Sequence, residues 1–194
     1  NDLIPFIEKH YRALADRELR HVRADDPAAA RALMALALKA ELPALAMMVG
    51  RLIAKMDGQQ FDGALYPVPT WQPNGGYHVD KALLFALMRH ESEFKTNPLS
   101  PARAHRLMQL MPSTASYVAQ DSTLKGKDKN RLFEPELNIT LGQKYVAYLL
   151  EHETVRGELF GMIAAYNGGP GKLAKWQRVT DHGDDPLLFV ESIP

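Results

Sequence analysis

The amino-acid sequence predicts an all-α protein, and three observations lead to that prediction. Apolar residues recur at steps of three and four in several segments, which is the spacing of one buried face of a helix. No segment shows the sustained two-residue alternation, rich in β-branched residues, that is typical of a strand. Aspartates or prolines stand directly before several of the apolar segments, where they favour the start of a helix.

The first 58 residues predict three successive helices, each with apolar side chains on one face. Asp26 precedes the second helix, whose first turn it can cap, and Pro43 begins the third. Gly58 is suited to the end of that third helix. Because helices joined by short loops bury their apolar faces on one another, we expect residues 1–62 to be stacked helical hairpins, as in a fragment of a superhelical solenoid, or else a three-helix cap on the next domain.

Residues 63–77 are expected to form a connector between two domains. Three prolines and a pair of glycines lie between Tyr66 and Gly76, and this composition disfavours a helix. A second domain is expected over residues 78–194. Its predicted helices cover residues 79–94, 107–120, 138–151 and 159–167.

The composition argues against several classes of protein. The 23 basic residues are balanced by 23 acidic ones, which disfavours a surface built to bind nucleic acid or anionic lipid. The chain has no cysteine, so it has no disulfide, thiol nucleophile or cysteine-ligated metal. Its seven histidines show no metal-ligand spacing, and we expect neither a metal nor a cofactor. No apolar run reaches the roughly 20 residues of a membrane-spanning helix, and no signal peptide is visible.

Glu91 is the strongest candidate for a catalytic residue. Asp80 can cap the helix that carries it, and Leu84 and Met88 lie on the same helix face as its carboxyl group. Burial disfavours the charged form of a carboxyl group, which is the preparation that a general acid needs. A structural glutamate, paired with an arginine or capping a neighbouring helix, is the alternative. Glu93 points elsewhere, and we expect it to be an ordinary surface charge.

Two other local patterns each have two interpretations. A helix carrying Tyr166 and Asn167 is followed at once by glycines and a proline, which would present both side chains at a fixed place for binding. A plain helix end with a tyrosine in the core is the alternative. The segment Asn138-Ile-Thr140 matches the spacing of a glycosylation acceptor, a pattern short enough to arise by chance.

Four motifs follow one another in the second domain. They are Glu91-Ser-Glu-Phe94, then Ser100-Pro with Leu107-Met-Gln-Leu-Met-Pro112, then Asn138-Ile-Thr-Leu-Gly-Gln-Lys-Tyr145, then Ala165-Tyr-Asn-Gly-Gly-Pro-Gly171. Each motif is weak alone, but the ordered set resembles the soluble lytic transglycosylase family from about Tyr66 to the C-terminus. The resemblance implies a lysozyme-like helical catalytic domain. The N-terminal helices resemble the end of the superhelical domain that precedes it in the large members.

The resemblance implies a lyase that cleaves the β-1,4 bond between N-acetylmuramic acid and N-acetylglucosamine in peptidoglycan and leaves a 1,6-anhydro product. Glu91 matches the single catalytic glutamate of the family, which acts first as an acid and then as a base. The N-acetyl group of the substrate stabilises the cationic centre, so no second carboxylate is required. The implied partners are peptidoglycan glycan strands, without nucleic acid or cofactor, and the implied location is the periplasm or cell envelope.

The resemblance also assigns residues to substrate binding. It implies that Ser100 and Tyr166 contact the N-acetyl group and that Glu191 meets the substrate more weakly. The residues implied to line the glycan cleft are Gln109, Met111, Tyr145 and Asn167.

Two departures from the family pattern bear on activity. Arg103 and Arg106 stand where the family usually has glycines, and a guanidinium beside Glu91 would favour its charged form, whereas outward-pointing arginines would leave it undisturbed. The family also continues beyond Ile193-Pro194, so the resemblance implies either a catalytic domain that is truncated at its C-terminus or a tail that this sequence does not include. The alternatives to an active transglycosylase are a catalytically impaired peptidoglycan-binding relative, a lysozyme-type muramidase, and a helical adaptor in which Glu91 is structural.

Overall fold

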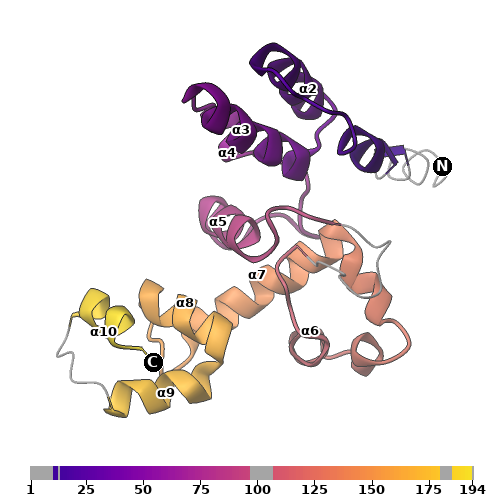
Figure 1. Cartoon of the computed structure of the whole chain (residues 1–194). Helices are drawn as coiled ribbons and strands as arrows, with labels where there is room; N and C mark the ends of the chain where they lie inside the picture. The colour runs from indigo at the N-terminus through magenta and orange to yellow at the C-terminus, as the bar shows by residue number, and fades with distance from the viewer. Residues whose placement is uncertain (1–10, 13, 97–106, 180–184, 194) are drawn as a thin grey trace.

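The computed structural model describes residues 11–12, 14–96, 107–179 and 185–193, and every regular element in those ranges is helical, as predicted. A hairpin of two helices near the N-terminus lies above a larger group of helices (Figure 1). Within the described ranges, no helix is both long and apolar enough to cross a lipid bilayer. Residues 11–12 and 14–19 are helical. The labelled elements that follow are α2 (Pro27–Lys39), α3 (Pro43–Asp57), α4 (Asp62–Leu65), α5 (Lys81–Ser92), α6 (Pro112–Ala119), the 3₁₀ turns η1 (Ser122–Lys125) and η2 (Lys129–Phe133), α7 (Pro135–Glu151), α8 (Leu159–Gly168), α9 (Pro170–Val179) and α10 (Pro186–Ser192).

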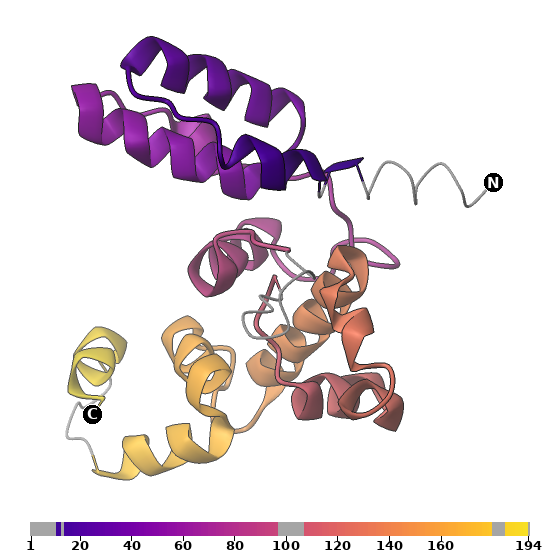
Figure 2. The same cartoon turned by 45° about the vertical axis from the view of Figure 1, so that its right-hand side comes forward.

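Helices α2 and α3 pack side by side as the N-terminal hairpin (Figure 2). Asp26 caps α2, because its side chain accepts hydrogen bonds from the backbone N–H groups of Ala28 and Ala29. Helix α3 ends before Gly58, which has a left-handed φ of 77°. Both helix boundaries therefore follow the signals in the sequence. The faces that the two helices bury form one hydrophobic cluster, which also includes Ala64 of α4.

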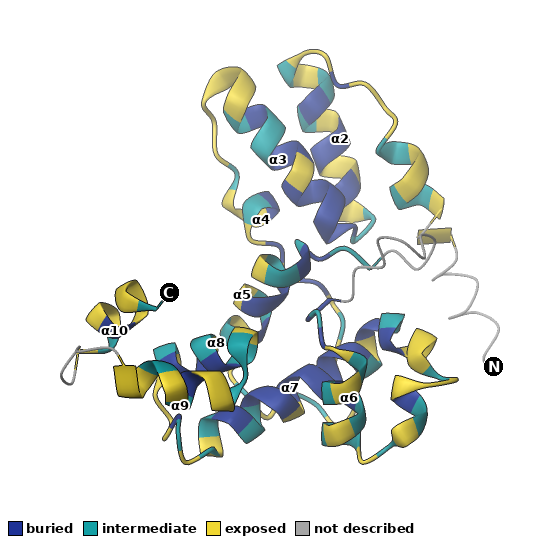
Figure 3. Cartoon of the chain, turned by 60° about the horizontal axis from the view of Figure 1, so that its bottom comes forward, coloured by how far each residue is buried: buried dark blue, intermediate teal, exposed yellow. Residues whose placement is uncertain are grey.

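Helix α7 lies at the centre of the larger group, and most of its surface is buried (Figure 3). It contacts α5, α6 and α8. It begins at Pro135, earlier than predicted, because the fixed φ of proline suits the first helical position. The hydrophobic cluster around α7 contains Ile139 of α7 together with Leu84 and Met88 of α5. The helix that carries Glu91 is thus held by its apolar face.

Helix α3 contributes side chains to both hydrophobic clusters. Leu45 and Val49 lie in the cluster of the N-terminal hairpin. Ala44 and Met47 instead belong to the cluster around α7. The hairpin is therefore packed directly onto the larger group of helices.

Glu93 is not an ordinary surface charge, so that expectation is wrong. Its carboxylate pairs with Arg51 of α3 and with Lys95, whose Nζ lies 2.8 Å from Oε2. The hydrogen bonds from Lys95 and Arg51 lower the pKa of Glu93 to about 2. The ion pair with Arg51 links the N-terminal hairpin to the end of α5, next to Glu91.

The stability of the fold is expected to depend on Glu93 in an acidic pH window. Because the folded-state pKa lies below the ordinary value of 4.5, the ion pairs contribute fully above about pH 4.5, and their contribution is lost as the pH falls toward 2. Glu93→Gln should therefore lower the urea midpoint of unfolding at neutral pH and converge with the wild type in strong acid. Glu151→Gln, at an exposed position, is the control and should match the wild type throughout. If the urea midpoints of Glu93→Gln and the wild type differed by the same amount at every pH, the ion pairs of Glu93 would not be the cause of the difference.

Residues 107–110 are not helical, so the predicted helix over residues 107–120 is wrong in its first turn. Helix α6 begins only at Pro112, because a proline inside a helix lacks an N–H to donate and clashes with the preceding turn. Leu107, Met108 and Leu110 are nevertheless buried. Their apolar spacing reflects the burial of an irregular segment rather than a helix face.

Two helices near the C-terminus were not predicted. Gly169 ends α8, as the sequence indicates, but Pro170 also begins α9, because proline fits the first position of a helix as well as it stops the preceding one. Helix α10 begins after Asp185, whose side chain accepts hydrogen bonds from the N–H groups of Leu187 and Leu188. Helix α10 packs against α8.

Candidate active site

Glu91 lies in the last turn of α5. The helix begins as predicted, because the Asp80 side chain accepts a hydrogen bond of 2.8 Å from the N–H of Leu83. Leu84 and Met88, on the face that Glu91 shares, are fully buried. The sequence therefore identified correctly a carboxyl group on an apolar helix face.

The carboxyl group of Glu91 is largely buried, and one of its oxygens has no hydrogen-bond partner among the described residues. Its side chain is 13% exposed, and its Oε1 atom is buried without a hydrogen bond in the described part of the chain. Nδ1 of His90 approaches Oε1 only to 3.5 Å, and the His90 side chain is 77% exposed. A structural glutamate would be satisfied by an arginine or a helix end. The described residues offer Glu91 neither, which leaves Oε1 available to a ligand.

The chain turns sharply after Glu91. Glu93 and Phe94 both have left-handed backbone conformations, with φ of 51° and 60°. Between them and Glu91, the buried Ser92 places its Oγ 3.0 Å from the carbonyl oxygen of Met88 and 2.8 Å from that of Leu107. The end of α5 is thereby tied to the segment that contains residues 107–110.

Tyr166 of α8 lies close to Glu91. Burial, followed by the negative charge of Glu91, raises the pKa of Tyr166 far above its ordinary value, so its hydroxyl keeps its proton. That hydroxyl donates a hydrogen bond of 2.7 Å to the carbonyl oxygen of Met108. The ring of Tyr145, on α7, lies 5.4 Å from the ring of Tyr166. Tyr145 is buried, with 9% of its surface exposed. The structure therefore brings Glu91, Tyr166 and Tyr145 together from three helices.

Met108 is the residue that holds this arrangement in place. Its N–H donates a hydrogen bond of 2.8 Å to Oδ1 of Asn138, whose Nδ2 donates to the carbonyl oxygen of Leu132, also at 2.8 Å. Its side chain packs against Gly142 of α7 so closely that a Cβ added at Gly142 would lie 2.0 Å from Sδ. Sequence reasoning missed this role, because it depends on a backbone carbonyl and on partners far along the chain.

Asn138 is a buried structural residue. Its side-chain oxygen and nitrogen both form hydrogen bonds, to Met108 and Leu132, and only 1% of its surface is exposed. A glycan needs an exposed asparagine, so the match of residues 138–140 to a glycosylation acceptor arises by chance.

The structure also describes four further predicted site residues, Gln109, Met111, Asn167 and Glu191. Gln109, with a left-handed φ of 46°, directly follows Met108, and Met111 is 64% exposed at the start of α6. Asn167 is exposed and donates a hydrogen bond of 3.3 Å to the carbonyl oxygen of Ile163. Glu191 is exposed on α10. Neither Asn167 nor Glu191 forms a hydrogen bond or ion pair with Glu91 in the described part of the chain.

Three predicted positions lie outside the described residues. They are Ser100, Arg103 and Arg106. The two interpretations of the arginines, pointing toward Glu91 or away from it, are therefore not tested by the structure. Within the described ranges, no three histidine, aspartate or glutamate side chains cluster as metal ligands would.

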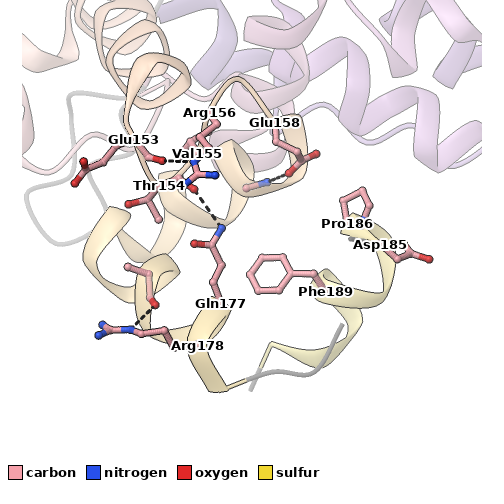
Figure 4. Close-up of a pocket in the computed structure, with 12 residues that line it drawn as sticks. Glu153, Thr154, Val155, Arg156, Glu158, Gln177, Arg178, Asp185, Pro186 and Phe189 are labelled. Carbon is pink, nitrogen blue, oxygen red and sulfur yellow. Dashed lines mark hydrogen bonds between the residues drawn. The ribbon is translucent and has the colours of Figure 1, made fainter. Parts of the chain in front are cut away.

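A pocket of about 680 Å³ lies between residues 153–158, α9 and α10 (Figure 4). Gln177 reaches across it and donates a hydrogen bond of 3.2 Å to the carbonyl oxygen of Thr154, and Phe189 forms part of its wall. None of the residues that line it is a predicted site residue. We therefore place the candidate active site at Glu91 and not in this pocket.

Comparisons with known proteins point to one family. The model of the transglycosylase SLT domain matches residues 71–189, more than half of the chain. The chain is 33% identical over 120 residues to the soluble lytic murein transglycosylase of Escherichia coli K12, an alignment that covers 61% of this chain and 18% of that protein. It is 36% identical over 108 residues to the membrane-bound lytic murein transglycosylase C of Edwardsiella ictaluri, covering 51% of this chain and 30% of that one.

Solved structures agree with these sequence matches. The crystal structure of the 70 kDa soluble lytic transglycosylase of Escherichia coli superposes with a TM-score of 0.69 and 25% identity, covering 89% of this chain and 28% of that one. An inactive mutant of the lytic transglycosylase Slt of Pseudomonas aeruginosa gives a TM-score of 0.63 at 23% identity, over 90% of this chain and 28% of that one, and supports the fold alone. The chain thus spans less than a third of the length of these relatives.

Proposed function

We propose a function for this chain on the premise that it belongs to the transglycosylase SLT domain family, which the match over residues 71–189 shows. The chain is a peptidoglycan lytic transglycosylase, a lyase that cleaves the β-1,4 bond between N-acetylmuramic acid and N-acetylglucosamine. The observation that carries the proposal is the largely buried Glu91, whose Oε1 has no hydrogen-bond partner in the described residues and whose carboxyl group lies beside Tyr166. A carboxyl group left in this condition is free to exchange a proton with a substrate.

Glu91 performs both proton transfers in the proposed reaction. It first donates its proton to the glycosidic oxygen as the bond between that oxygen and C1 of the muramic residue breaks. The N-acetyl group of the same sugar stabilises the positive charge at C1. The carboxylate then takes the proton of the C6 hydroxyl group as O6 bonds to C1, which closes the 1,6-anhydro ring and restores the acid. No water is consumed, so the reaction needs no second carboxylate to activate it.

The residues around Glu91 bind and orient the glycan strand in this proposal. Tyr166 contacts the N-acetyl group together with Ser100, and the hydrogen bond from Tyr166 to Met108 supports the position of its ring. Glu191 contacts the substrate more weakly than Tyr166 and Ser100 do. Gln109, Met111, Tyr145 and Asn167 line the cleft.

We base the proposed division of the chain into domains on the same family. Residues 78–194 carry the catalytic site, residues 63–77 connect, and residues 1–62 are the end of a superhelical domain. The relatives named above are a soluble and a membrane-bound murein transglycosylase, and the place of action that we propose for this chain is the cell envelope, where peptidoglycan lies.

The proposal is tested by the chemistry of the products. Purified protein incubated with peptidoglycan sacculi should release muropeptides with 1,6-anhydro ends, which mass spectrometry identifies and which borohydride does not reduce. Products with reducing ends would show a lysozyme-type muramidase instead. Binding to sacculi without release of any product would contradict the proposed activity and favour an impaired relative.

A further inference from the structure

A row of four tyrosines leads from Glu91 toward the surface. Tyr166 of α8 contacts Tyr145 of α7, and the ring of Tyr148, also on α7, lies 6.2 Å from that of Tyr145 in a stacked arrangement. Tyr117 of α6 follows, with its ring 5.6 Å from that of Tyr148 and nearly perpendicular to it. The row therefore connects the candidate catalytic group to a position on a neighbouring helix.

Exposure increases from Tyr145 outward along this row. Tyr145 is 9% exposed and belongs to the hydrophobic cluster around α7, and Tyr148 is only partly buried against that cluster. Tyr117 is 64% exposed and is not part of the cluster. Packing of the core accounts for the inner tyrosines, but it does not require the outermost one. Tyr117 leaves an aromatic surface open to a ligand at the end of a continuous aromatic row.

The two outer tyrosines are held in fixed positions. Burial, followed by a hydrogen bond with the Tyr117 hydroxyl group, raises the pKa of Tyr148, so the Tyr148 hydroxyl group keeps its proton at neutral pH. The ring of His152 packs edge-on against Tyr148 at 5.7 Å. A tyrosine that is already held in place loses little conformational entropy when a ligand binds to it. The pair thus offers a preorganised surface with an apolar ring and a polar edge.

A pyranose ring matches this surface chemically. Its C–H groups form an apolar face that packs on an aromatic ring, and its hydroxyl groups lie at the edge, where the tyrosine hydroxyl groups can bond to them. We propose that Tyr117 and Tyr148 form a further sugar-binding subsite, which takes a ring of the glycan strand at a distance from the bond that is cleaved. This inference rests on the proposed function, since it extends the cleft that contains Glu91.

The subsite should make the enzyme sensitive to the length of the glycan strand. Tyr117→Ala should raise KM about three- to tenfold for long strands, in the range of one lost aromatic contact, and leave kcat unchanged, because the contact is equally strong before and during the reaction. The shortest strand that the wild type cleaves should show no change. Tyr148→Phe, which keeps the ring, should cause a smaller increase in KM. Tyr11→Ala is the matched control, since Tyr11 has the same exposed fraction of 64% and lies in the N-terminal helical region.

The measurement combines turnover of purified strands of defined length with binding of the same strands to each variant. Equal KM and equal affinity of Tyr117→Ala and wild type for long strands would overturn the subsite. An equal loss on short and long strands would also overturn it, since that result indicates a general structural effect. A wild type that binds long strands more tightly than Tyr117→Ala but cleaves none would leave the subsite supported and the proposed activity refuted.

Discussion

Glu91→Gln is expected to lower kcat for the release of anhydro-muropeptides by about 10³-fold or more, because an amide can neither donate the acid proton nor accept the one from the C6 hydroxyl group. The variant should fold as the wild type does. Glutamine has nearly the shape of glutamate, and Oε1 of Glu91 makes no hydrogen bond in the described residues that the change could break. Mass spectrometry of a sacculus digest measures the product, and thermal unfolding checks the fold.

A second glutamate serves as the control for that experiment. Glu151→Gln makes the same chemical change at an exposed position at the end of α7 and should keep full activity. Activity of Glu91→Gln within about tenfold of the wild type would mean that Glu91 transfers no proton in the slow step. A structural role for Glu91, with another group transferring the proton, would then be favoured.

Asn138→Ala is expected to destabilise the fold by about 3 kcal/mol, because it leaves a buried N–H of Met108 and a buried carbonyl of Leu132 without partners, at about 1–3 kcal/mol each. Activity should fall as well, since the same segment accepts the hydrogen bond of Tyr166. Urea unfolding at neutral pH measures the change in the free energy of unfolding.

The control is an asparagine that the structure leaves exposed. Asn130→Ala, in η2, should change the free energy of unfolding by less than about 0.5 kcal/mol, as is usual for surface substitutions. A similarly small change for Asn138→Ala would show that the two hydrogen bonds do not hold the segment in place.

The sequence predicted those parts of the fold that depend on neighbouring residues. The caps at Asp26 and Asp80, the helix end at Gly58 and the apolar face beneath Glu91 are all local patterns, and the structure contains each of them. The irregular segment over residues 107–110 could not be predicted in this way. Its N–H and carbonyl groups bond to distant side chains, and its apolar residues have the spacing of a buried helix.

In the candidate site, too, the sequence predicted what depends on neighbouring residues and missed what depends on distant ones. Glu91 stood out from the residues of its own helix, whereas the place of Tyr166 beside it came only from the resemblance to a family, because the two belong to different helices. Nothing near Tyr117 in the sequence distinguishes it from a core tyrosine. The pairing of Glu93 with Arg51 was missed because a single helix does not show what packs against its end.

The contact between Gly142 and Met108 restricts how relatives of this chain can diverge. An alanine at position 142 would gain about 1 kcal/mol in helix propensity, yet its methyl group would need the volume that the thioether now fills. We expect these two positions to change together or not at all. A bulkier residue on the helix would call for a smaller one in the facing loop, so the pair should covary across the family.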